Sequence, residues 1–319
     1  MLEKYCPNLT ILSIPLRNNF RGITFREVAI FRGSQGWSEF SPFLEYDDAE
    51  ATPWMEAALE AANKKWPTLY RERVAINATL PMVNPSEVRE ILSRFPGSTT
   101  VKIKVNDFEN GALLVEEVLN INSEMMIRLD VNGGWTVEQA INNLLEYHLR
   151  FGNIFDYVEQ PCMKLSELAE VKSQVPIAIA ADESIRKNLR SDFENFSRYA
   201  DVAILKWQPI GGFAAAQAIA EQIGLPVVIS SALETGIGIS HGLALAASFP
   251  DQRYACGLGT VALFESDISD PTTTTSDGFL EVTRRVPIDH ERYLATPERT
   301  DHWRRRILRV LELIERGSN

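Results

Sequence analysis

Long apolar runs, cysteine and histidine are scarce in this chain of 319 residues, which has three cysteines and four histidines. Cys6, Cys162 and Cys256 lie far apart and form no Cys-x-x-Cys pair. A disulfide framework or a structural zinc site is therefore not expected, and a reducing cytoplasm fits best. No run of about 18 apolar residues occurs, so no membrane-spanning helix is expected. The N-terminus, MLEKYCPNLT, has no basic segment followed by an apolar stretch, so no signal peptide is predicted.

Positive charge is also in short supply, since 32 Lys and Arg against 43 Asp and Glu give a net charge of −11. A chain of this charge is not expected to bind nucleic acid or an anionic membrane. It is compatible with a small anionic substrate, because a site can be locally positive. Hydrophobic and charged contents of 45% and 24% are typical of a globular protein with a sizeable core. No pattern in the sequence indicates an oligomeric state.

Residues 1–72 predict a small unit of strands followed by a helix. Strands are expected at 10–16, 24–32 and 36–40. The segment RNNFRG (17–22) is expected to connect the first two strands, and helical periodicity predicts a helix within 47–65. Strands followed by a helix are typical of an α+β unit.

Between residues 73 and 265 the pattern changes to a repeated order of strand, loop and helix. The apolar segments that predict strands are 74–80, 101–105, 126–132, 155–160, 177–183, 202–207, 226–231 and 255–260. Amphipathic stretches such as 86–95, 110–121 and 213–223 lie between them. Polar residues at the strand ends recur about every 25 residues, which is typical of parallel βα units. Eight such units predict an α/β fold closed into a barrel, which leaves no sheet edge. An open doubly wound sheet is the alternative, but no glycine-rich phosphate loop follows an early strand.

Residues 266–319 are too short for a further domain and are expected to pack back on the N-terminal unit. The polar run DPTTTTSDG predicts a loop, 280–286 predicts a strand and 302–316 predicts a charged helix.

Charged residues interrupt the apolar segments at the ends of consecutive predicted strands. In order they are Lys102 and Lys104, Asp130, Glu159, Asp182 with Glu183, and Lys206. A single acid at such a position can be a turn residue or a helix cap, and two lysines on one strand can lie on a solvated face. Three carboxylates on adjacent barrel strands would converge and repel each other. A hard divalent cation would resolve the repulsion, and Mg²⁺ is expected, with Mn²⁺ as a substitute.

The lysines flank these carboxylates on both sides. Burial and neighbouring positive charge lower the pKa of a lysine, and a lowered pKa suits proton abstraction. The pattern therefore predicts removal of a proton next to a carboxylate, with the developing negative charge stabilised by the metal ion.

These residues, read together as KxK, DVN, VEQP, ADES and LK, resemble the catalytic pattern of the enolase superfamily in its muconate-lactonising branch. The resemblance extends over nearly the whole chain. It implies an α+β capping domain formed by the N-terminus (1–72) and the C-terminal tail (266–319), around a (β/α)7β TIM-like barrel (73–265). Within this branch, GWSEFSPFLEYDDAEATPW, INATLP, SSALETGIG and GLGT are similar to the actinobacterial type of the o-succinylbenzoate synthase family.

That family implies a metal-dependent lyase of menaquinone biosynthesis. It would carry out the syn dehydration of 2-succinyl-6-hydroxy-2,4-cyclohexadiene-1-carboxylate to o-succinylbenzoate. N-acylamino acid racemases and dipeptide epimerases share the scaffold and remain the alternative. A non-catalytic barrel whose strand ends are merely salt-bridged is a rival of another class.

The resemblance also implies individual roles. Asp130, Glu159 and Asp182 would bind the metal ion, and Lys104 would remove the proton and return it to the departing hydroxide. Lys206 would hold the ring face through a cation–π contact. Lys102 would support Lys104 electrostatically and touch the substrate carboxylate, and Asn132 would orient a ligand.

Backbone amides near two predicted strand ends are expected to receive the succinyl carboxylate, helped by a following helix start. The residues concerned are Ser230, Ser231, Gly257, Gly259 and Thr260. A plain strand-to-loop turn and a satisfied strand-end hydroxyl are the alternatives. The loop 17–22 is expected to close the site, with Phe20 excluding water and Arg21 meeting a substrate carboxylate, although any surface hairpin can carry an arginine.

Overall fold

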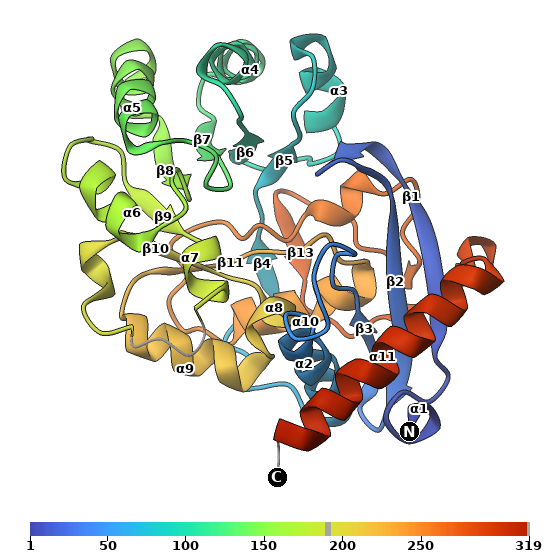
Figure 1. Ribbon diagram of the computed structural model, residues 1–319. Coiled ribbons are helices and arrows are strands. Elements are labelled where there is room, and N and C mark those ends of the chain that lie inside the picture. The colour runs from blue at the N-terminus through green and yellow to red at the C-terminus, as the bar shows by residue number, and fades with distance from the viewer. Residues whose placement is uncertain (189–192, 318–319) are drawn as a thin grey trace.

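The computed structural model describes residues 1–188 and 193–317, and it begins with an antiparallel sheet (Figure 1). The sheet contains β1 (Thr10–Phe20), β2 (Ile23–Gly33) and β3 (Gly36–Phe40), paired in that order. The strands β1 and β2 are longer than the sequence predicts, because only Arg21 and Gly22 connect them. Both have positive φ, 53° and 82°, as a tight hairpin turn requires. The hairpin therefore projects well beyond the sheet.

The barrel strands form one parallel sheet that curls into a ring. Its strands, in order of pairing, are β5 (Ala78–Leu80), β6 (Thr100–Lys104), β7 (Met126–Asp130), β8 (Phe155–Glu159), β9 (Ile179–Ala181), β10 (Val202–Leu205) and β11 (Val227–Ile229). Parallel bridges from Ile76 to Cys256 and from Ser230 to Gly257 place the segment 256–257 between the first and last strands. The ring is thereby closed, and the predicted (β/α)7β barrel is confirmed.

Two predicted strands are wrong in detail. The segment 74–80 divides into β4 (Arg73–Ala75), which pairs with β13 (Phe279–Glu281), and β5. The segment 255–260 contributes bridges but no regular strand. The chain there turns directly into a short 3₁₀ helix at Thr260–Leu263.

Helices cover the outer side of the ring (Figure 1). They are α3 (Val88–Leu92), α4 (Phe108–Ile121), α5 (Val137–Phe151), α6 (Leu165–Lys172), α9 (Phe213–Ile223) and α10 (Gly236–Ala247). The short helices α7 (Glu183–Arg186) and α8 (Trp207–Ile210) begin directly after Asp182 and Lys206, at the mouth of the ring. Side-chain caps mark where the longer ones begin. Asp107 accepts a hydrogen bond from the Asn110 amide at the start of α4, and Thr136 with Gln139 forms a capping box at α5.

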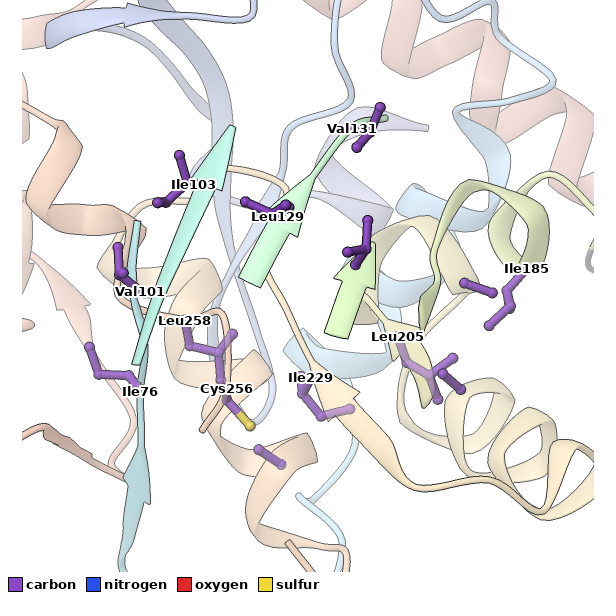
Figure 2. Packing of buried hydrophobic residues seen from close by; sticks show 14 of the residues in the cluster. Ile76, Val101, Ile103, Leu129, Val131, Ile185, Leu205, Ile229, Cys256 and Leu258 are labelled. Carbon is purple, nitrogen blue, oxygen red and sulfur yellow. The ribbon is translucent and has the colours of Figure 1, made fainter. Parts of the chain in front are cut away.

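Strand alternation divides the barrel core into two parts. Val101 and Ile103 of β6 and Leu129 of β7 belong to the large cluster between strands and helices (Figure 2). The alternate positions face the interior of the ring, where Tyr157, Ala180, Val202, Ile204 and Val228 form a second, smaller cluster. Lys102 and Lys104 therefore face the interior, above this apolar floor.

The remaining elements join the N-terminal sheet. Helix α2 (Thr52–Asn63) packs against β3 through buried alanines, and α1 (Leu2–Tyr5) precedes β1. Helix α11 (Pro297–Gly317) starts five residues before the predicted helix and lies along the N-terminal sheet (Figure 1). Its Trp303, Ile307 and Leu311 are buried in the core of that sheet.

The predicted strand 280–286 also divides, into β13 and β14 (Val286–Pro287), and β14 pairs with β12 (Ser269–Asp270). In the described part of the chain, no helix is both long and apolar enough to cross a membrane.

Candidate active site

The charged residues predicted from the strand ends meet at the carboxyl-terminal mouth of the barrel. Lys104, Asp130 and Glu159 are paired across β6, β7 and β8, so they lie at one level of the sheet. Asp182 follows β9 and Lys206 follows β10, at the same edge. Parallel strands end together, which explains why residues far apart in the chain converge here.

Each carboxylate lies beside a lysine ammonium group. Lys102 Nζ is 3.0 Å from Asp130 Oδ2 and 3.0 Å from Glu159 Oε2, while Lys104 Nζ is 2.7 Å from Asp130 Oδ2. Lys206 pairs with Asp182. The three carboxylates are each only 1% exposed. Three lysines thus face three carboxylates that are almost fully buried.

The two lysines of β6 have opposite pKa shifts. Burial and the charge of Lys102 lower the pKa of Lys104, and attraction to Asp130 only partly opposes this. Burial also opposes the charge of Lys102, but attraction to Asp130 and Glu159 raises its pKa well above the ordinary value. Lys104 is therefore the easier of the two to deprotonate.

The other charged groups also titrate differently from free side chains. Burial opposes ionisation of Asp182, yet Lys206 and Arg186 lower its pKa. Burial and repulsion by Asp130 raise the pKa of Glu159 to about 7. Burial acts against the charge of Lys206, but Asp182 and Glu159 raise its pKa. Lys206 therefore stays protonated at neutral pH.

The three carboxylates have the chemistry of a site for a hard divalent cation. All their donors are oxygens, and Asp130 Oδ1 is buried without a hydrogen-bond partner among the described residues. No group of three or more Asp, Glu, His or Cys side chains in residues 1–188 and 193–317 converges as a ready-made metal site. The lysine contacts account for this absence. Each carboxylate is paired with an ammonium group, in the place where a divalent cation would bind. The donor set fits a divalent metal ion that displaces part of these lysine contacts.

Asn132 connects Lys104 to the next charged residues. It accepts a hydrogen bond from Lys104 Nζ at 2.6 Å and donates to Glu183 Oε1 at 3.3 Å. Arg186 donates to the same Glu183 oxygen at 3.0 Å and lies 3.7 Å from Asp182. The sequence interpretation missed Arg186, whose signal was its place one helical turn after Glu183.

The hairpin tip and the segment that follows β3 close the cavity above these charges. Phe20 places its ring 5.8 Å from Lys104 Nζ. Arg21 lies 3.5 Å from Glu45, donates to the Tyr46 hydroxyl at 3.4 Å and stacks on the ring of Phe43. Both tip residues line the cavity, as do three aromatic residues that the sequence interpretation missed: Phe43, Tyr46 and Trp54.

The expected backbone donors are only partly available. Ser230, Ser231, Gly257 and Thr260 line the cavity. However, the amides of Ser230, Ser231 and Gly257 already donate to backbone carbonyls of the closing ring. Gly259 lies outside the described lining, since a side chain there would meet Ile76 and Phe95. Ser230, Ser231 and Thr260 also bring hydroxyl groups to this wall.

The start of α10 is not free for a substrate either. Buried Glu39 of β3 accepts hydrogen bonds from the Thr235 amide at 3.1 Å and the Gly238 amide at 3.3 Å. The expected helix start after Ser231 therefore holds a carboxylate of the protein itself.

Two family models match the chain. The one described as enolase N-terminal domain-like covers residues 11–62, and the one described as enolase C-terminal domain-like covers residues 87–287. The o-succinylbenzoate synthase of Mycobacterium tuberculosis is 42% identical over 320 residues, covering 98% of this chain and 96% of that protein.

Solved structures share the fold at low sequence identity. The muconate lactonizing enzyme of Pseudomonas fluorescens has a TM-score of 0.72 at 19% identity, covering 89% of this chain and 96% of that chain. The N-succinyl Arg/Lys racemase of Bacillus cereus has a TM-score of 0.75 at 19% identity, covering 90% of this chain and 96% of that chain.

Proposed function

The chain belongs to the enolase superfamily and, within it, to the o-succinylbenzoate synthases, and we propose the reaction of this chain from that membership and from the geometry of its site. The reaction is the syn dehydration of 2-succinyl-6-hydroxy-2,4-cyclohexadiene-1-carboxylate to o-succinylbenzoate, a step of menaquinone biosynthesis in the cytoplasm. The observation that carries the proposal is the row of three buried carboxylates, Asp130, Glu159 and Asp182, with Lys104 and Lys206 beside them at one edge of the barrel. The partner is a small anionic molecule rather than nucleic acid or a membrane.

Enzymes of this superfamily generally use a divalent metal ion. Asp130, Glu159 and Asp182 would hold it here, with Mg²⁺ as the first choice and Mn²⁺ as a substitute. When bound, the metal ion stabilises the negative charge that develops on the substrate carboxylate.

Lys104 carries the proton in both halves of the reaction. Its amine takes the proton from the ring carbon that bears the carboxylate, and the resulting ammonium group gives a proton to the hydroxide that leaves the neighbouring carbon. One C–H bond and one C–O bond break, one C=C bond forms, and water is released. Both transfers occur at one Nζ, so both groups leave from the same face of the ring. The lowered pKa of Lys104 and its hydrogen bond to Asn132 suit this role.

Lys206 and Lys102 act through their charge. Lys206 lies at the other end of the carboxylate row and faces the ring through a cation–π contact. Lys102 lowers the pKa of Lys104 and lies within reach of the substrate carboxylate. Phe20 and Arg21 cover the bound ring, and the wall at Ser230, Ser231, Gly257 and Thr260 takes the succinyl arm.

The loss of absorbance of the cyclohexadiene tests this function. The purified protein is assayed with Mg²⁺, after EDTA treatment, and after Mg²⁺ is added back. Conversion should require the metal ion and should yield o-succinylbenzoate. A metal-loaded protein that leaves the substrate unchanged would contradict the proposal.

A racemase of N-acylated amino acids, or a dipeptide epimerase, is the second candidate. It is favoured by the positions of Lys104 and Lys206 at opposite ends of the carboxylate row, as two-sided proton transfer needs. N-succinyl amino acids incubated in deuterated buffer would report it by exchange of the α-proton. Exchange far faster than dehydration would favour this candidate over the synthase.

A further inference from the structure

Thr79 of β5 carries a hydroxyl group that the fold itself leaves unsatisfied. The residue is 2% exposed and lines the cavity above the barrel. Its Oγ1 atom has no hydrogen-bond partner in the part of the chain that the structure describes. Its neighbours Ala78 and Leu80 belong to the outer hydrophobic cluster, so alternation turns Thr79 to the inside. In register it lies directly beside Lys102 of β6.

Other hydroxyl groups lie on the same side of the cavity. The ring closes through 256–257, which lies between β5 and Ser230 at the end of β11, and Ser230, Ser231 and Thr260 line the same cavity as Thr79. Ser231 Oγ and Thr260 Oγ1 are 2.7 Å apart. In such a pair one hydroxyl donates to the other, so one proton remains for a ligand. Ser230 Oγ lies over Gly257, where any side chain would collide with it.

This hydroxyl wall (Thr79, Ser230, Ser231 and Thr260) lies across the ring from the carboxylates. Counting around the closed ring, β8 with Glu159 is opposite the segment 256–257. A substrate whose reacting carboxylate lies at the charged side therefore extends its other end toward the hydroxyl wall. Buried polar groups are normally hydrogen-bonded, so an unsatisfied hydroxyl that faces a cavity points to a ligand acceptor.

We propose that Thr79 is a specificity-determining residue that donates a hydrogen bond to the terminal carboxylate of the succinyl arm. This inference rests on the proposed function, which supplies the two-carboxylate substrate. Thr79, Ser230, Ser231 and Thr260 are uncharged, so on this wall neutral hydroxyl groups rather than a salt bridge recognise the arm. A hydrogen bond to a charged group is typically worth about a tenfold to a hundredfold change in binding.

Thr79→Val tests the inference because valine keeps the shape and removes only the hydroxyl. No internal hydrogen bond is lost, so the melting temperature should stay equal or rise. Thr79→Ser should restore the wild-type behaviour. Ser38→Ala is the matched control, since Ser38 of β3 is also buried with an unsatisfied hydroxyl but does not line the described cavity.

The readout is the dissociation constant, measured by calorimetry with Mg²⁺, for o-succinylbenzoate and for 2-butanoylbenzoate, which lacks the terminal carboxylate. Thr79→Val should weaken the first at least about tenfold and leave the second unchanged. The same variant should raise KM more than it lowers kcat.

An equal loss of affinity for both ligands, or an unchanged affinity for o-succinylbenzoate, overturns the inference. If wild-type protein dehydrates the cyclohexadiene while Thr79→Val binds the product normally, only this inference fails. Absence of dehydration by the wild type refutes the proposed function itself.

Discussion

Replacing Lys104 with methionine keeps an unbranched side chain of similar length in the cavity but removes the ammonium group. In the wild type, Nζ lies 2.7 Å from Asp130 Oδ2 and donates to Asn132 Oδ1 at 2.6 Å. The substitution therefore removes the proposed proton carrier and one of the two cations beside Asp130. These two losses have different sizes and can be measured separately.

The loss of turnover should be the larger effect. A positioned acid or base contributes roughly 10²–10⁴-fold, and Lys104 is proposed to act as both in succession. We expect kcat to fall by about 10⁴ or more, equivalent to about 5.5 kcal/mol in the activation barrier. Breaking a buried ion pair costs roughly 3–5 kcal/mol when the remaining charge has no partner. Lys102 stays 3.0 Å from the same Asp130 oxygen. The free energy of unfolding should therefore fall by less than about 3 kcal/mol.

Absorbance assays with Mg²⁺ and urea unfolding measure the two effects on the same preparation. Lys164→Met is the control, because the Lys164 side chain is 75% exposed and its ion pair is with Glu167 on the surface. The control should keep both activity and stability. A Lys104→Met variant that remains folded and keeps more than about one hundredth of the activity would refute the acid–base role.

Three further substitutions test other parts of the structure. Asp182→Asn should reduce the rise in melting temperature that Mg²⁺ gives the wild type, measured by differential scanning fluorimetry with and without EDTA. Glu39→Ala leaves the buried amides of Thr235 and Gly238 without their acceptor and should lower the unfolding free energy by about 3–5 kcal/mol in urea titrations. Burial lowers the pKa of His241 to about 3 in the folded protein, so below pH 6.5 the unfolded chain binds a proton that the folded one excludes. Stability should then fall by up to about 1.4 kcal/mol per pH unit between pH 6.5 and 3, and His241→Gln should flatten that slope in unfolding curves at pH 7 and 5.

The charged row could be predicted because it depends on two local properties of the sequence. Alternation in β6 fixes which face Lys102 and Lys104 share, and similar spacing places Asp130, Glu159 and Asp182 at the ends of neighbouring strands. The parallel strands of a barrel end at one edge of the ring. A residue's position within its strand therefore fixes its distance from that edge. The roles of these residues stay predictions that the experiments above address.

The rim of the cavity could not be predicted in the same way. Phe43, Tyr46 and Trp54 reach the site only because the N-terminal sheet packs against the barrel, which no local pattern encodes. The hairpin was predicted too short because Arg17, Asn18 and Asn19 have the polarity of a loop. A two-residue turn lets both strands continue through this polar segment to the rim of the cavity.

Three of the expected amide donors, those of Ser230, Ser231 and Gly257, are engaged in backbone hydrogen bonds for a related reason. Glycine and serine at 230–231 and 257–259 are typical of a backbone that approaches a ligand closely. In this barrel the same amides close the ring between β11 and β5, and the last gap is bridged by only a few backbone hydrogen bonds. The closure of the barrel thus engages backbone amides that composition alone would assign to substrate binding.

The two lysines of β6 show what local pattern alone leaves open, since only the family resemblance gave them different roles. They share a strand, a face and a residue type, and they differ only in height by two positions. Lys102, one step deeper, lies between Asp130 and Glu159, and attraction to both outweighs burial and holds its proton. Burial lowers the pKa of Lys104, which pairs with Asp130, is repelled by Lys102 and donates to the neutral amide of Asn132, so its proton is held less tightly. A Lys102→Met variant should therefore raise the pKa of Lys104 by removing that repulsion, and the alkaline shift of its pH–rate profile would measure the coupling. An unshifted profile would show that the two ammonium groups act independently.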